Sequence, residues 1–119
     1  MIDMLYVGEG NVVGFRISGR VEDADFDRVA ALIEQTLDAH DQVRIYAEIE
    51  SLDGISLDAL WKDLQFSCKH IRDVEREAVV TDQQWLANLA GIGDRLFSGI
   101  EVRHFGLHQK DEARDWILE

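Results

Sequence analysis

The sequence has no proline, a single cysteine and half as many basic as acidic residues, and each shortage narrows what the chain can be. No stretch has the composition of a linker, a low-complexity segment or a repeat, so residues 1–119 are expected to form one domain. The lone cysteine, Cys68, cannot form an internal disulfide. Nothing in the sequence therefore marks an oxidising compartment.

The shortage of basic residues bears on partners and location. Twelve Lys and Arg residues stand against 24 Asp and Glu residues, which gives a net charge of −12. This charge repels the phosphates of nucleic acids and anionic lipid headgroups, so broad binding to either is not expected. No apolar run approaches the roughly 20 residues that span a bilayer. The first residues also lack the basic start and apolar core of a signal peptide. We therefore expect a cytoplasmic protein without an integral membrane segment.

The first half of the chain shows two strand patterns, a helix and a further strand. Residues 4–7 and 12–18 are rich in strand formers and flank a glycine-containing turn, which predicts an antiparallel hairpin. A helix is expected to begin at Glu22-Asp23, with its apolar side formed by Phe26, Val29, Ala30, Ile33 and Leu37. In residues 43–49, apolar side chains alternate with Arg44, Tyr46 and Glu48, which is typical of a strand with one dry and one wet face.

The second half continues the alternation of helices and strands. Helices are expected over residues 54–71, 81–97 and 111–117, and strands over 78–80 and 100–105. Alternating strands and helices favour parallel pairing with right-handed crossovers. The sequence thus predicts an α/β fold: an N-terminal hairpin, a mixed and mostly parallel sheet, and helices on one face. The polar side of residues 43–49 predicts that the other face is largely open to solvent.

Several short motifs carry a resemblance to a known family. They are Gly14, Gly19, Val21, Ile55-Ser56-Leu57, Ala59-Leu60-Trp61-Lys62-Asp63-Leu64, Lys69-His70, Glu75-Arg76, Ala78-Val79-Val80, Asp82, Trp85, Val102-Arg103 and Phe105. With the order of elements, these residues resemble the SpoIIAA-like branch of the STAS superfamily, the sulfate transporter and anti-sigma factor antagonist domains. The resemblance covers essentially the whole chain and is most specific over residues 61–80.

The resemblance implies a small, non-enzymatic bacterial protein that works by binding. Anti-sigma factor antagonists of this superfamily are switched by phosphorylation of a serine that follows an aspartate at the start of the second helix. Here the matching loop reads Asp53-Gly54-Ile55-Ser56, so the Asp-Ser pair is missing. Ser56 is well placed as an N-cap, and a phosphate there would also suit a helix N-terminus. Helix cap and phosphosite both remain open.

No motif in the sequence predicts catalysis, a metal or a cofactor. His104 and His108 are four residues apart, but they are expected in a strand end and a loop rather than on one helical face. A nucleophile elbow and a phosphate-binding glycine loop are both missing. Glu48 and Glu50 are expected to pair with bases such as Arg103. We therefore expect neither an enzyme nor a metal site.

The second predicted helix has an unusual outer face. At 100° per residue from its apolar stripe, Phe66 lies on the opposite side, with Lys62, Lys69 and His70 beside it. Phe66 could pack under a neighbouring loop. An aromatic side chain among cations in an acidic protein also fits a binding patch for an acidic or amphipathic partner. These four residues are the predicted partner-binding site, and the partner is another protein or a second copy of the chain.

The third predicted helix carries more apolar surface than packing on one sheet requires. Its apolar arc includes Trp85, Leu89 and Phe97, and Gly91 and Gly93 weaken the helix in its middle. The arc could pack on the second helix, face another copy of the chain, or line a groove with Trp61 for an apolar, lipid-like molecule. The sequence thus predicts a STAS-like regulatory or protein-interaction module. A carrier or sensor of an apolar small molecule is the alternative.

Overall fold

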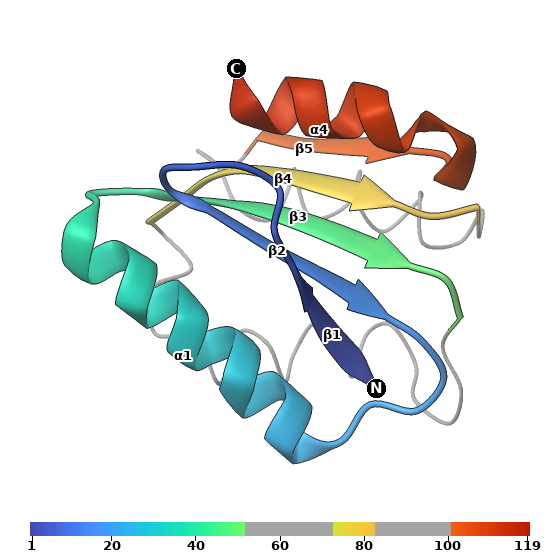
Figure 1. The fold of residues 1–119 in the computed structure, drawn as a ribbon, viewed down its shortest axis with the longest axis horizontal. Helices are drawn as coiled ribbons and strands as arrows, with labels where there is room; N and C mark the ends of the chain where they lie inside the picture. Colours follow the sequence, from blue (N-terminus) through green and yellow to red (C-terminus); the bar gives the residue numbers. More distant parts are fainter. Residues whose placement is uncertain (52–72, 83–100) are drawn as a thin grey trace.

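Five strands and two longer helices make up the part of the chain that the structure describes. The structure is a computed structural model, and it describes residues 1–51, 73–82 and 101–119. A short 3-10 turn over Leu107–Gln109 precedes the last helix. The other elements are β1 Ile2–Leu5, β2 Val12–Ile17, α1 Asp23–Ala39, β3 Val43–Ile49, β4 Val74–Val80, β5 Glu101–Phe105 and α4 Lys110–Leu118 (Figure 1).

The strands form one mixed sheet in the order β1-β2-β3-β4-β5. β1 runs antiparallel to β2, whereas β2, β3, β4 and β5 are all parallel to their neighbours. The predicted hairpin is confirmed, although its first strand begins and ends two residues earlier than expected. Pairing ends where Leu5 faces Gly14, and the chain after β1 passes very close to this glycine. A Cβ on Gly14 would lie 2.5 Å from a methyl carbon of Val7.

Helix α1 covers one face of the sheet with the apolar side that the sequence predicts. Its start is a capping box between Glu22 and Asp25, in which the Glu22 amide donates to the Asp25 carboxylate at 3.0 Å. Phe26, Val29, Ala30 and Ile33 are buried and pack on β2 and β3. The cluster continues through Val13, Phe15, Ile17, Val43, Ile45, Ala47 and Ile49.

Helix α4 covers the opposite face, which corrects the expectation that helices lie on one face only (Figure 1). Ala113, Trp116 and Ile117 of α4 pack in one cluster with Tyr46, Ala78, Val80 and Phe105 of the sheet. Tyr46 and Glu48, which were predicted to face the solvent, are fully buried. A polar side chain can be buried if its hydrogen bonds are satisfied, and the alternation in a single strand does not show whether a later helix supplies the partners.

The predicted helix over residues 54–71 and all but the first two residues of that over 81–97 lie outside the described part of the chain. Within the described part, no helix is long and apolar enough to cross a membrane.

Candidate functional site

The site residues predicted from the sequence also lie outside the described part of the chain. They are Ser56, Trp61, Lys62, Phe66, Lys69, His70, Trp85, Leu89 and Phe97. The partner patch, the apolar groove and the role of Ser56 therefore stay predictions. The described residues hold three other polar groupings, and sequence reasoning did not anticipate their geometry.

The first grouping surrounds Glu48 beneath the start of α4. The Glu48 side chain is fully buried, and its Oε1 accepts a hydrogen bond from the Tyr46 hydroxyl at 2.6 Å. Its Oε2 accepts from Arg16 Nε at 2.9 Å and lies 3.7 Å from Lys110 Nζ. The carboxylate thus joins β2, β3 and α4 in one polar contact. The expectation that Glu48 and Glu50 pair with a basic residue is confirmed, but the residue is not Arg103, the example named. Arg16 takes that place and also lies 3.4 Å from Glu50.

The charge state of this grouping follows from its contacts. Burial opposes ionisation of Glu48, but the hydrogen bonds from Tyr46 and Arg16 and the charge of Lys110 outweigh it and lower the pKa of the carboxyl. Burial and the neighbouring Glu48 raise the pKa of Tyr46, although Arg114, 5.9 Å from the ring centre, acts the other way. At neutral pH, Glu48 is an ionised acceptor and Tyr46 a neutral donor. Both are suited to holding α4 in place.

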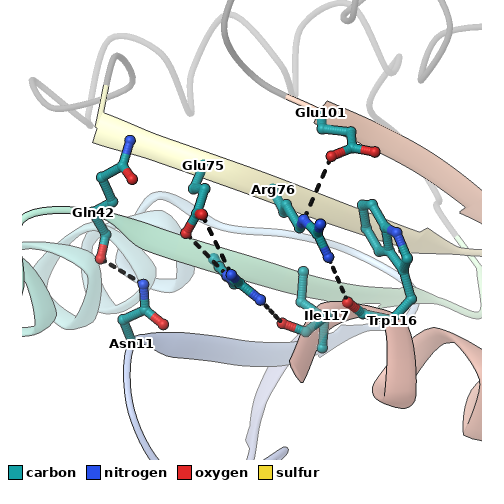
Figure 2. Close-up of polar contacts among 8 residues, drawn as sticks. Asn11, Gln42, Glu75, Arg76, Glu101, Trp116 and Ile117 are labelled. Carbon is teal, nitrogen blue, oxygen red and sulfur yellow. Dashed lines mark hydrogen bonds and ion pairs between the residues drawn. The ribbon is translucent and has the colours of Figure 1, made fainter. Parts of the chain in front are cut away.

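The second grouping holds the other end of α4 through two arginines of the sheet (Figure 2). Arg44 donates to the Ile117 carbonyl at 2.9 Å, and Arg76 donates to the Trp116 carbonyl at 3.0 Å. The last carbonyls of a helix have no partner within the helix and carry partial negative charge, so cations stabilise them. Each arginine is held in turn by a carboxylate, Glu75 at 3.0 Å and Glu101 at 3.4 Å respectively.

Trp116 adds an aromatic contact to this docking. The guanidinium carbons of Arg76 and Arg103 lie 5.0 Å and 5.4 Å from the centre of its ring. Such distances are those of cation–π contacts. The ring of Phe105 lies tilted against the Trp116 ring, with 6.0 Å between ring centres. Arg103, expected to pair with a glutamate, is therefore placed against a tryptophan.

The third polar feature is one carboxyl, that of Glu77, on the α1 side of the sheet. Its neighbours across the sheet are Ile45 in β3 and Val102 in β5, which share a cluster with α1. Glu77 is only 5% exposed, and no hydrogen bond or ion pair joins it to another residue of the described ranges. Burial alone raises its pKa to about 7. The sequence held a signal for this residue, because alternation traced backwards from the buried Val79 places Glu77 on the same face.

Comparison with known proteins agrees with this architecture. The profile of the SpoIIAA-like family matches residues 12–118. The chain belongs to the SpoIIAA-like family. Among curated proteins no match was found. A solved structure, that of an uncharacterized DUF3478 family protein with a SpoIIAA-like fold from Shewanella loihica PV-4, is similar with a TM-score of 0.70 at 24% identity. The similarity covers 98% of this chain and 92% of that one. It confirms the predicted fold.

The histidines in the described part of this SpoIIAA-like chain do not form a metal site. His104 Nε2 lies 2.8 Å from the Thr81 carbonyl, and the His108 ring packs close to Gly106. In residues 1–51, 73–82 and 101–119, no three His, Cys, Asp or Glu side chains are grouped as metal ligands. Asp82 beside them accepts a hydrogen bond from the Leu107 amide at 2.9 Å, which holds the turn before α4.

Proposed function

We propose that this SpoIIAA-like protein is a non-enzymatic regulatory module that binds a partner protein through the segments that join β3 to β4 and β4 to β5. The observation that supports this proposal is that polar side chains of the sheet hold α4 in place. Glu48, Arg44 and Arg76 each contact α4 or its ends directly. Side chains that lock a helix onto a sheet make a rigid scaffold, and binding residues are commonly carried by segments that connect the elements of such a scaffold.

The chemistry of the partner follows from the predicted patch on the first of these segments. Helical spacing predicts that Lys62, Lys69 and His70 lie around Phe66, in a chain whose net charge is −12. An aromatic anchor with a cationic rim complements an apolar residue flanked by acidic ones. The partner is therefore an acidic or amphipathic segment of another protein or of a second copy of the chain.

A substitution pair tests this proposal. Phe66→Asp introduces an acidic group into the patch and should abolish partner capture, whereas Tyr6→Asp should leave capture unchanged. Tyr6 is a suitable control because it is an aromatic residue that is 77% exposed in the strand-free segment after β1. Immobilised wild type and both variants are compared by quantitative mass spectrometry of captured protein, with thermal melting to show that each is folded. Light scattering of the free chain distinguishes a second copy from another protein.

Equal capture by wild type and Phe66→Asp, with both proteins folded, would remove the patch from the mechanism. Loss of capture in both variants would point to a general effect of added negative charge. Either result would leave the family membership and the fold intact, since neither depends on the patch.

One observation favours the alternative function, a carrier or sensor of an apolar small molecule. Glu77 is a buried carboxyl on an apolar face, and no described residue satisfies it. A bound molecule is one possible source of a hydrogen-bond donor for a carboxyl that finds none among the described residues. In this version Trp61, Trp85, Leu89 and Phe97 line the groove. Native mass spectrometry of the purified protein should then show a bound compound that organic solvent removes. Mass spectra of the bare chain alone, from several preparations, would speak against a carrier.

A further inference from the structure

The first strand lies at an edge of the sheet and pairs along one side only. Among the described strands, β2 is the only neighbour of β1 (Figure 1). The Met1 amine donates to the Ser18 carbonyl at 2.8 Å, and the Ser18 amide donates to the Met1 carbonyl at 2.9 Å. Bonded and non-bonded pairs alternate along an antiparallel ladder, so Asp3 is also bonded to β2. The backbone groups of Ile2 and Met4 therefore point away from β2, toward the open edge.

Two side chains of α1 occupy the outward backbone groups of Ile2. Arg28 Nη2 donates to the Ile2 carbonyl at 2.8 Å, and the same nitrogen lies 2.5 Å from the Asp25 carboxylate. The Glu22 amide does most to lower the pKa of Asp25, and the bonds from Arg28 and from the Ile2 backbone act in the same direction. Arg28 Nη2 thus takes the position that the amide of an added strand would need, because backbone hydrogen bonds have the same length.

The remainder of the β1 edge lacks the usual protection of an edge strand. Charged side chains on an edge discourage pairing with another chain. The opposite edge strand, β5, has them in Glu101 and Arg103, both exposed. In β1 the only charged side chain is Asp3, and Met4 beside it is 38% exposed. The protection of β1 therefore depends on the contact with α1.

We infer that the Asp25–Arg28 pair protects the β1 edge from self-association, and that a second copy of the chain adds to this edge when the pair is removed. The occupant is a second copy because an antiparallel pair of identical edge strands can be two-fold symmetric, so that each strand offers the other the same groups. This inference goes beyond the proposed partner binding, since it involves none of the residues of the predicted patch.

One register of the two strands satisfies both hydrogen bonding and charge. With Met4 opposite the partner's Met4, the outward groups of both residues are bonded reciprocally, and two exposed apolar side chains meet. Asp3 then lies opposite the partner's Leu5, so that two aspartates do not face each other. Ile2 lies opposite the partner's Tyr6, and this pair can form only when the outward groups of Ile2 are free. Arg28 and Asp25 block that step.

Sedimentation velocity over a range of concentrations tests the inference. Arg28→Ala should self-associate about tenfold or more tightly than wild type, because it frees the Ile2 carbonyl on both copies. Arg20→Ala is the matched control. Arg20 is also an exposed arginine, and its loss changes the net charge by the same amount. This control should associate as wild type does. Thermal melting shows that each variant is folded.

A second substitution shows whether the association uses β1. Met4→Pro, added to Arg28→Ala, should return the association to the wild-type level, because proline has no N–H to donate to a second copy. The fold should tolerate this proline, since the Met4 N–H points away from β2. In Arg28→Ala at high concentration, the Met4 amide should be protected from hydrogen exchange, whereas in wild type it should exchange freely.

The other outcomes each overturn the inference. If Arg28→Ala associates no more tightly than wild type, the Asp25–Arg28 pair does not protect the edge. An equal gain in Arg20→Ala would show that the lost charge is responsible. If folded Arg28→Ala/Met4→Pro keeps the gain, the copies do not meet at β1. Arg28→Met keeps an unbranched side chain but has no donor, so it should repeat the gain of Arg28→Ala. Failure of the proposed patch is a separate result, because Phe66→Asp should leave this gain unchanged.

Discussion

The two faces of the sheet are closed by different physical means. On the α1 face, Phe26, Val29 and Ile33 meet aliphatic residues of β2 and β3, and the contact is almost wholly apolar. On the α4 face, a smaller apolar cluster around Trp116 is ringed by ion pairs and by arginines that bind helix carbonyls. Apolar burial favours association without regard to direction, whereas the charged contacts require one orientation and one position of the helix.

This difference has an energetic consequence. Burial of apolar area contributes about 25 cal/mol for each Å² removed from water, so the α1 face is the main source of stability. A buried ion pair gains Coulomb energy but loses hydration, and its net contribution is often close to zero. Loss of one partner is costly all the same, because the other charge stays buried. The contacts of α4 therefore determine where the helix lies more than they stabilise the fold.

The largest effect is expected on the apolar face. Phe26→Ala should lower the free energy of unfolding by about 3–5 kcal/mol, since it removes a buried aromatic side chain and leaves a cavity. Urea unfolding followed by circular dichroism measures this loss. The loss should be the same at low and high salt. A loss that shrinks markedly in 1 M salt would show that the two faces do not differ as described.

The single carboxyl on the apolar face should produce the next largest effect, and with the opposite sign. The folded pKa of Glu77 is about 7, above the ordinary value of 4.5, so folding is penalised as pH rises from about 4.5 to 7 and the penalty is complete above 7. Glu77→Gln should thus stabilise the free protein by up to about 3 kcal/mol at pH 8 and by much less at pH 5. Thermal unfolding at both pH values tests this. A gain that does not change with pH would contradict a raised pKa.

The smallest effect is expected on the α4 face. Glu48→Gln should destabilise the fold by about 2 kcal/mol at pH 7, because it leaves Arg16 and Lys110 without their buried counter-charge. The folded pKa of Glu48 is lowered, so its stabilisation is present above the ordinary value and is lost as pH falls through the folded value. The difference between wild type and variant should therefore narrow below about pH 4.

A matched substitution sharpens this last prediction. Glu50 also pairs with Arg16, but its side chain is 45% exposed, so Glu50→Gln should cost about 0.5 kcal/mol or less. Urea titrations of both variants, at several pH values, measure the contrast. If both variants lose the same free energy of unfolding, the burial of Glu48 does not matter for its contribution to stability.

Local patterns predicted much of the described fold. The spacing of Phe26, Val29 and Ile33 placed α1 and its buried side, and the alternation in residues 43–49 placed β3. Both are short-range signals that the backbone periodicities impose. The strand at residues 78–80 was predicted too short. The observed strand, β4, begins at Val74. Residues 74–77 are mostly polar, so they gave no strand signal, but parallel pairing with β3 extends the strand through them.

The sequence by itself determined the presence of the described strands, the family, and which side of α1 is buried, because each depends on residues close together along the chain. Only the tertiary structure decided which polar residues are buried and which of them find hydrogen-bond partners. Glu48 accepts hydrogen bonds from Tyr46 and Arg16, whereas no partner for Glu77 is found among the described residues, although both are glutamates in strands of the same sheet. The reason is that a buried charge depends on donors from distant segments, here Arg16 and Lys110 for Glu48, and no local pattern records whether those donors arrive.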